Sequence, residues 1–250
     1  MVYKAVISDW NGTVTESSEV DSNKRIGYTM LGDAKKAAKG GSLRALGTLG
    51  RLAMAKIIIE RRLAAYEGGE GHLWDVYRPF NFAIRGQSPH YINSIVDGFA
   101  ADTISQIDGR FVRPIAKMHG KGKITGILSV AYERVIRSTL VEAGYSRFFD
   151  HIVANSLEVN DGSVVGFTMD IYGRKAEVLR REFFERLGLT EKDVLYAGDT
   201  EDDEPIADLL PRGHFIVPLL ASAGFRERMA SKGAFAPEDE KDFELYLRKR

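Results

Sequence analysis

The chain of 250 residues contains no cysteine, which excludes disulfide bonds, thiol nucleophiles and cysteine-based zinc sites. It also lacks an excess of charge of either sign, with 35 Lys plus Arg against 35 Asp plus Glu, so the overall balance favours neither nucleic acid nor acidic lipid. No apolar run approaches the ~20 residues of a membrane span, and the start of the sequence has no signal-peptide architecture. We therefore expect a cytoplasmic protein without a membrane span.

Short apolar runs that end in a polar residue indicate buried strands of a parallel sheet. Such runs stop at Asp9, at Ser129 and at Asp199. A further strand is expected over residues 149–155, and two β-rich runs around an Asn-Asp-Gly turn predict a hairpin over residues 157–166. With 44% apolar residues the chain can bury one large core or a core with an insertion.

Helical patterns alternate with these strands. One covers residues 131–143 with Val135, Leu140 and Val141 pointing inward, and another runs from Lys175 to about residue 187, where Gly188 ends it. A charged helix is expected after residue 237. Strands that alternate with helices in this way describe an α/β fold, a Rossmann-like doubly wound parallel sheet.

The stretch between the first and second strands contains two helical patterns and no confident strand. A helix over residues 42–66 is capped by Ser42, and a second covers residues 88–107. The apolar face expected for the first of these helices consists of Leu46, Leu49, Ala53 and Ile57. We therefore predict a helical cap domain over residues 15–108, inserted into a core domain of residues 1–14 and 109–250, with an aromatic core formed by Trp74, Tyr77, Phe80 and Phe82.

Residues 35–62 are locally basic. Their cationic residues are Lys35, Lys36, Lys39, Arg44, Arg51, Lys56, Arg61 and Arg62. A solvated helix face is the favoured interpretation. A basic surface that docks on a membrane or on nucleic acid is the open alternative, although neither partner is expected from the whole chain.

The polar strand ends and helix starts converge on one edge of the predicted sheet, where open α/β sheets bind ligands. Several carboxylates gathered there would repel one another without a cation, and an all-oxygen set suits Mg²⁺. A lysine and a hydroxyl beside them can hold phosphoryl oxygens and leave one carboxylate to attack. Each residue alone also has an ordinary explanation as a helix cap, a first-turn carboxylate or a surface lysine. The converging residues are Asp9, Ser129, Lys175, Asp199, Asp202 and Asp203.

Four ordered motifs resemble those of the haloacid dehalogenase-like (HAD) hydrolase superfamily. They are Asp9–Thr13, the strand ending at Ser129, the helix opened by Lys175, and Gly198–Asp203. The stretch from Ser129 to Lys175 and the position of the helical insertion are similar to the phosphoserine phosphatase branch. This resemblance implies a phosphatase acting on a small phosphorylated metabolite through an aspartyl-phosphate.

The resemblance also implies a role for each matching residue. Asp9 is the expected nucleophile, and Ser129 and Lys175 are expected to bind the phosphoryl group. The main-chain carbonyl of Asn11 and the side chain of Asp199 join Asp9 around Mg²⁺. Asp203, and with it Asp202, is expected as a direct or indirect metal partner. Thr13 supports the loop on the substrate side.

Asn11 departs from the family pattern, in which a second Asp protonates the leaving group and then activates water. Asn can do neither, and such acid–base help is worth ~10²–10⁴ in rate. Three outcomes fit this departure: another acid such as Glu16 or His72 replaces it, the substrate has a good leaving group, or the protein is a catalytically weak module that binds phospho-ligands or a protein partner. Val130–Tyr132 replace the small glycines usual in the branch, which argues against phosphoserine itself. Oligomeric state is left open.

Overall fold

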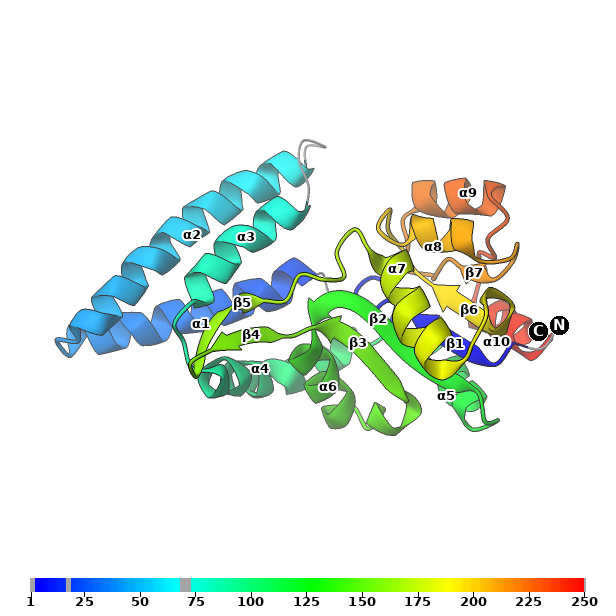
Figure 1. The fold of residues 1–250 in the computed structure, drawn as a ribbon, viewed down its shortest axis with the longest axis horizontal. Coiled ribbons are helices and arrows are strands. Elements are labelled where there is room, and N and C mark those ends of the chain that lie inside the picture. The colour runs from blue at the N-terminus through cyan, green and yellow to red at the C-terminus, as the bar shows by residue number, and fades with distance from the viewer. Residues whose placement is uncertain (1–2, 17–18, 68–72, 250) are drawn as a thin grey trace. The chain divides into compact units, whose positions relative to one another are not determined.

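The computed structural model describes residues 3–16, 19–67 and 73–249 (Figure 1). It divides into two compact units. The core unit consists of Met1–Ser18, Ala100–Asn155 and Met169–Arg250, and the cap unit of Glu19–Phe99 and Ser156–Thr168. The hairpin segment thus belongs to the same compact unit as the inserted helices, whereas the predicted domains assign it to the core. The predicted boundaries, residues 15–108 for the cap, stay a prediction.

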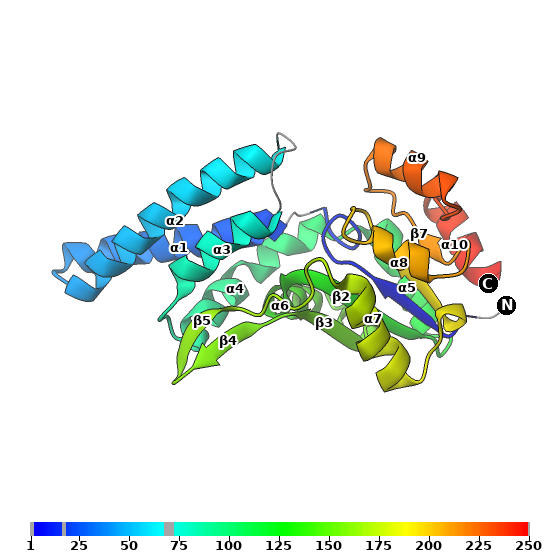
Figure 2. The same cartoon turned by 45° about the horizontal axis from the view of Figure 1, so that its top comes forward.

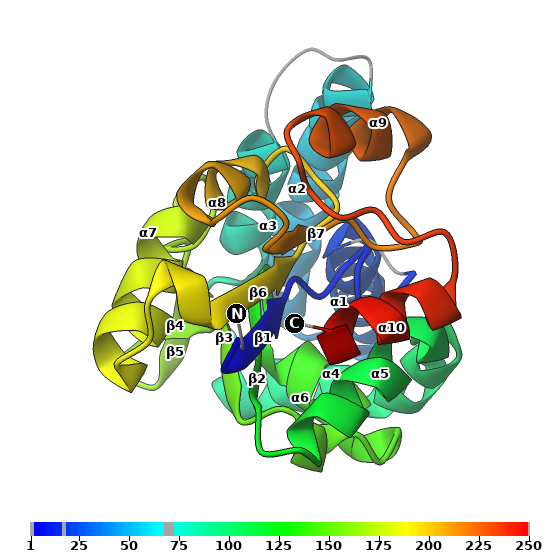
Figure 3. The same ribbon diagram turned by 90° about the vertical axis from the view of Figure 1, so that its right-hand side faces the viewer.

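The core unit is built on a five-stranded parallel sheet of order β3-β2-β1-β6-β7 (Figure 3). In the central strand, Ile7 lies opposite Gly126 of β2 and Tyr196 of β6. The strands are β1 (Ala5–Ser8), β2 (Ile124–Tyr132), β3 (His151–Asn155), β6 (Val194–Ala197) and β7 (Phe215–Ile216). This architecture confirms the predicted α/β class with a Rossmann-like doubly wound sheet.

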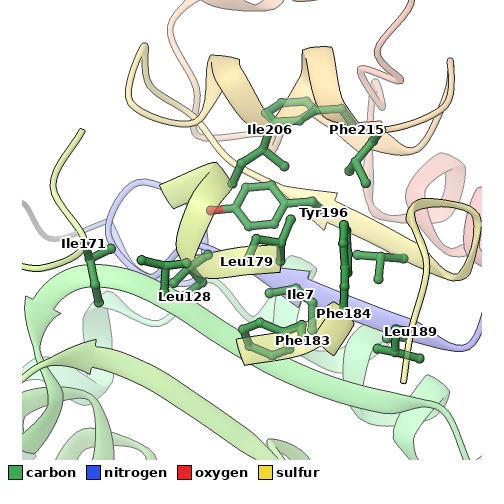
Figure 4. Close-up of a cluster of buried hydrophobic side chains, with 14 of the residues drawn as sticks. Ile7, Leu128, Ile171, Leu179, Phe183, Phe184, Leu189, Tyr196, Ile206 and Phe215 are labelled. Carbon is green, nitrogen blue, oxygen red and sulfur yellow. The ribbon is translucent and has the colours of Figure 1, made fainter. Parts of the chain in front are cut away.

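Alternate residues of each strand point to opposite faces of the sheet, and each face carries its own layer of helices. On one face, Ile7, Leu128 and Tyr196 pack among buried side chains such as Leu179 and Phe183 (Figure 4). The elements on that side are α7 (Lys175–Leu179), its π-helical continuation η3 (Arg180–Glu185), α8 (Glu204–Leu209) and α9 (Ala223–Ser231).

On the other face, Val6, Ile127 and Leu195 contact buried residues of a second helical layer. That layer consists of α5 (Gly109–His119), α6 (Glu133–Glu142) and α10 (Glu240–Lys249). Short 3₁₀ segments complete the core unit: η1 (Ile104–Gln106), η2 (Ser146–Phe148) and η4 (Glu191–Asp193). Because both faces are covered, the central strands are almost continuously apolar, which is why they were predictable from the sequence.

The cap unit contains long helices and the hairpin (Figures 1 and 2). Its elements are α1 (Glu19–Lys39), α2 (Leu43–Glu67), α3 (Leu73–Ile84), most of α4 (Pro89–Thr103), β4 (Leu157–Asn160) and β5 (Ser163–Phe167). The Phe80 ring stacks on Phe167 at 5.7 Å between centroids, and the amide of Phe167 donates to Asn81 Oδ1. These contacts attach α3 to the hairpin. Helices α1 and α3 were not predicted, whereas α2, α4 and the hairpin were.

The predicted inward faces of two helices need correction. Leu46 and Ile57 of α2 are each 53% exposed, and the buried side of that helix carries Leu52 and Ala55. In α6, Val135 and Leu140 are buried as expected, but Val141 is 61% exposed. Apolar residues occur on two sides of α2, so periodicity alone does not select the buried one. Of the predicted aromatic core, Phe80 is buried and Phe82 is largely exposed, while the side chains of Trp74 and Tyr77 lie outside the described part.

Strand β2 extends past Ser129, the residue at which the sequence predicted its end. The strand continues to Tyr132, and its register against β3 shifts between Ser129 and Tyr132. The side chain of Asn155 donates to the carbonyl of Val130 at this irregularity. The following helix therefore begins at Glu133 rather than at residue 131.

Within the described residues, none of the helices combines the length and the apolar character that crossing a membrane requires.

Candidate active site

The loop that follows β1 holds Asp9 at the carboxyl end of the central strand. Asp9 is 2% exposed, its amide donates to the carbonyl of Ala197 on β6, and its Oδ1 accepts from the amide of Trp10 at 2.6 Å. The chain turns at Gly12 with φ of +70°, and a Cβ there would lie 2.0 Å from Asp199 Oδ2. Only glycine fits this left-handed position and this close approach.

Lys175 places a buried ammonium among the carboxylates. Its Nζ lies 2.6 Å from Asp9 Oδ2, 2.7 Å from Asp203 Oδ1 and 3.7 Å from Asp202 Oδ2. Burial alone would lower the pKa of Lys175, but Asp203 and Asp9 outweigh it and raise that pKa well above its ordinary value. Lys175 is therefore a permanent cation that orients Asp9.

Asp203 organises the second half of the site. Its Oδ1 accepts from Lys175 and from the Tyr196 hydroxyl at 2.7 Å, and its Oδ2 accepts from the amides of Asp199 and Thr200 and from the Thr200 hydroxyl. A fully buried carboxylate with five donors is held in one orientation. Asp203 therefore ties the loop after β6 to Lys175.

The carboxylates of Asp9, Asp199 and Asp203 offer oxygen atoms that all lie within 4.8 Å of one another. Burial raises the pKa of Asp199 to about 8, with Asp9 and Asp203 adding to the shift. Burial also raises the pKa of Asp9 to about 6, against the opposing effect of Lys175. One ammonium does not balance three clustered carboxylates, and all donors are hard oxygens. This donor set fits Mg²⁺.

The remaining predicted residues lie on the same edge or on its loops. The Ser129 hydroxyl is fully buried, hydrogen-bonds Asp9 and accepts from the amide of Ala131. Thr13 donates to Asp199 Oδ1 at 3.0 Å, which supports a carboxylate of the cluster. Asn11 is 8% exposed in the loop between Asp9 and Gly12. The core unit thus brings together, through contacts of their side chains, Asp9, Thr13, Ser129, Lys175, Asp199 and Asp203.

Two residues were named above as possible replacements for the general acid that Asn11 cannot supply. Glu16 is exposed at the end of the described segment 3–16, and His72 lies outside the described residues. In the cap unit, Arg78 is exposed, and Arg85 donates from Nε to the carbonyl of Val165.

Sequence reasoning missed Tyr196. This residue is fully buried in β6 and directs its hydroxyl to Asp203. Burial and the nearby Asp203 raise the pKa of Tyr196 well above its ordinary value, so the phenol stays a proton donor. The available signal was a tyrosine inside an otherwise aliphatic strand, because a buried hydroxyl requires a partner.

The sequence and the fold were compared with known proteins. Residues 6–208 match the family model described as haloacid dehalogenase-like hydrolase. A search of curated proteins found no match.

Solved structures share the fold at low sequence identity. A substrate-bound phosphoserine phosphatase is 13% identical with a TM-score of 0.60, and the match covers 100% of this chain and 99% of that one. A phospho-aspartyl intermediate analogue of phosphoserine phosphatase is 14% identical with a TM-score of 0.59, covering 99% and 100%. A HAD family hydrolase from Salmonella enterica subsp. enterica serovar Typhi is 15% identical with a TM-score of 0.63, covering 99% of this chain and 72% of the other. The family match over most of the chain, on a fold that carries all four motifs at one sheet edge, establishes that this protein belongs to the haloacid dehalogenase-like hydrolases.

Proposed function

We propose that the protein is a Mg²⁺-dependent phosphatase that hydrolyses a small phosphorylated substrate through a phosphoaspartate on Asp9. The observation that carries the proposal is the buried ion pair between Lys175 and Asp9 beside the carboxylates of Asp199 and Asp203. A nucleophile at this sheet edge, a fixed cation and an all-oxygen metal set are the groups that phosphoryl transfer needs.

Asp9 supplies the nucleophilic oxygen. Its carboxylate attacks phosphorus, so that an O–P bond to Asp9 forms while the ester O–P bond breaks and the leaving oxygen keeps the electron pair. Water then attacks the same phosphorus, which releases inorganic phosphate and regenerates the Asp9 carboxylate. The Lys175 ammonium, 2.6 Å from Asp9, keeps this carboxylate ionised and oriented.

The phosphoryl oxygens require donors that are in place before the reaction. Lys175 and Ser129 both contact Asp9 and therefore lie beside the position of the phosphoryl group. Mg²⁺ would neutralise the charge of the phosphate. It would be held by Asp9, Asp199 and the main-chain carbonyl of Asn11, with Asp203 behind these ligands. Thr13 fixes Asp199, and Tyr196 fixes Asp203, through the hydrogen bonds described above.

The substrate is proposed at the level of its class. Two of the structures with this fold are named as phosphoserine phosphatase, which supports a small phosphate monoester. Identities of 13% and 14% do not carry phosphoserine to this chain. Val130–Tyr132 continue strand β2 with larger side chains than glycine, and this favours another substrate.

Asn11 supports a second candidate function, a module that binds phospho-ligands and turns them over slowly. Asn11 occupies the loop beside Asp9 yet cannot exchange a proton. We expect Asn11→Asp to raise the rate on an alkyl phosphate by about 10²–10³-fold, because the carboxylic acid protonates the poor leaving group and its carboxylate then activates water. For p-nitrophenyl phosphate, the rate of phosphoryl transfer to Asp9 should rise less than it does for the alkyl phosphate, since the phenolate leaves without a proton.

This substitution distinguishes the two candidates. Steady-state kinetics of wild type and Asn11→Asp on both substrates measure the effect, and Asn93→Asp in the cap unit is a matched control for the added charge. An Asn11→Asp variant that binds inorganic phosphate and Mg²⁺ but hydrolyses neither substrate would favour the binding module.

The direct test of the proposed function is hydrolysis of p-nitrophenyl phosphate by the wild-type protein, with and without Mg²⁺. Turnover that EDTA abolishes and that added Mg²⁺ restores supports the phosphatase. Absence of turnover over the whole range of Mg²⁺ concentration would contradict it.

Binding of Mg²⁺ should also raise the melting temperature more at pH 8 than at pH 6. Burial raises the pKa values of Asp199 and Asp9 above their ordinary value of 3.8, so the metal-free folded state binds more protons than the unfolded state. Metal-free stability from these groups is therefore present at acidic pH and falls as pH rises towards 8. Mg²⁺ needs the ionised carboxylates and replaces those protons. At a concentration 100-fold above Kd the gain is about 2.7 kcal/mol.

Differential scanning fluorimetry at both pH values measures this effect. Asp199→Asn should lose most of the Mg²⁺-dependent shift, whereas Asp208→Asn, which changes an exposed carboxylate, should keep it. An equal shift in wild type and Asp199→Asn would show that Mg²⁺ binds elsewhere.

A further inference from the structure

Helix α2 of the cap unit exposes a row of large aliphatic side chains. We call it the α2 outer face and define it as Leu43, Leu46, Met54, Ile57 and Ile58. Their exposed fractions are 82%, 53%, 57%, 53% and 38%, in that order. Spacings of 3, 11 and 14 residues from Leu43 to Leu46, Met54 and Ile57 place these side chains on one side of the helix. A set of exposed apolar side chains on one side of a helix marks a surface that binds a partner.

The opposite side of α2 is already used by the fold. Ala45, Leu52 and Ala55 are buried, and α2 contacts both α1 and α3 (Figures 1 and 2). Packing within the cap unit therefore does not need the α2 outer face. Gly47 and Gly50 have open space around the position of a Cβ, so small residues on this helix do not serve close packing either.

The surroundings of the α2 outer face are strongly basic. Residues 35–62 contain eight Lys and Arg against one acidic residue, Glu60, which gives 8 − 1 = +7, although the whole chain has zero net charge. The cationic side chains of this segment that are largely solvent-exposed are Lys35, Lys36, Lys39, Lys56, Arg61 and Arg62. Positive charge is thus concentrated on the segment that also exposes the aliphatic row.

We propose that the α2 outer face and the lysines at the end of α1 dock the protein on an anionic lipid bilayer. Apolar side chains beside Lys and Arg are the composition of helices that lie in a membrane interface. A second copy of the chain fits less well, because a dimer formed through this face would bring together two segments that each have a net charge of +7. Nucleic acid would use the cations but not the five exposed aliphatic side chains. The proposal does not depend on the catalytic assignment.

Vesicle co-sedimentation of the full chain tests this docking. The vesicles contain either phosphatidylcholine alone or phosphatidylcholine mixed with phosphatidylglycerol. We expect binding to the anionic vesicles only, weakened by added salt because surface charges are screened. Met54→Asp combined with Ile57→Asp should reduce binding at least tenfold, and so should Lys35→Glu, Lys36→Glu and Lys39→Glu together.

Matched controls separate docking from general effects of charge or folding. Val141→Asp adds an acid at an apolar side chain that is 61% exposed on α6. The triple variant Lys121→Glu, Lys192→Glu and Lys241→Glu makes the same charge change on exposed lysines of the core unit. Both controls should bind anionic vesicles as wild type does, and circular dichroism checks that every variant is folded.

Three results would overturn the proposal. One is equal binding to neutral and anionic vesicles, or to neither. Another is a dimer, measured by light scattering, that Met54→Asp with Ile57→Asp dissociates in a protein that does not bind vesicles. The third is tight binding of a DNA or RNA oligonucleotide that displaces the vesicles and is insensitive to substitution of Met54 and Ile57.

Discussion

Replacing Lys175 with methionine should lower the free energy of unfolding by about 3–5 kcal/mol at pH 8 and abolish phosphatase activity. The Lys175 ammonium is 1% exposed and ion-pairs with both Asp9 and Asp203, so its loss leaves buried carboxylates without their cation. Methionine keeps an unbranched apolar stem of similar length, one atom shorter, and therefore removes the ammonium with little other change. Urea denaturation of the metal-free variant measures the loss of stability.

The loss should be smaller at pH 5, because Asp9 and Asp199, whose pKa values burial has raised, are then protonated and need no cation. Lys192→Met removes an exposed lysine and serves as the control, with little change expected. A Lys175→Met variant as stable as Lys192→Met at both pH values would contradict the buried ion-pair network.

Replacing Asp9 with asparagine should reduce turnover of p-nitrophenyl phosphate by about 10⁴-fold or more, because the attacking oxygen is lost while the shape is kept. The folded state should tolerate this change well. Burial disfavours the Asp9 carboxylate, and asparagine removes that unfavourable charge. We therefore expect a large loss of kcat with little loss of stability, a combination that a merely structural role for Asp9 would not produce.

Steady-state kinetics and urea denaturation of the same Asp9→Asn preparation measure both quantities. Asp208→Asn changes an exposed carboxylate of α8 and should leave kcat unchanged. Turnover of Asp9→Asn within tenfold of wild type would exclude Asp9 as the nucleophile.

The candidate site was predictable because its residues follow local rules. Asp9 and Asp199 end apolar runs, and Lys175 opens a helix, so each position could be located without knowing the tertiary structure. Parallel strands then place these ends on one edge, where the structure measures 2.6 Å from Lys175 to Asp9. The order of the four motifs predicted the family, and the family match over residues 6–208 confirms that prediction.

Other features depend on contacts that sequence periodicity does not contain. Tyr196 reaches Asp203 only because the loop after β6 folds back over its own strand. Ser129 looked like a strand end because it is polar, yet β2 continues to Tyr132 beside Asn155. In α2, two apolar sides compete, and packing against α1 and α3 selects the side with Leu52. The predicted side proved to be the exposed one.

The most direct measurement of the central claim is the location of the phosphoryl group during turnover. Wild-type protein is mixed with Mg²⁺ and p-nitrophenyl phosphate, quenched in acid within the first turnover and analysed by peptide mass spectrometry. Because Asn11 cannot activate water, the phosphoenzyme should accumulate, with one phosphoryl group on the peptide that contains Asp9. Turnover with no phosphoryl group on that peptide, or with a phosphoryl group on another residue, would contradict the account.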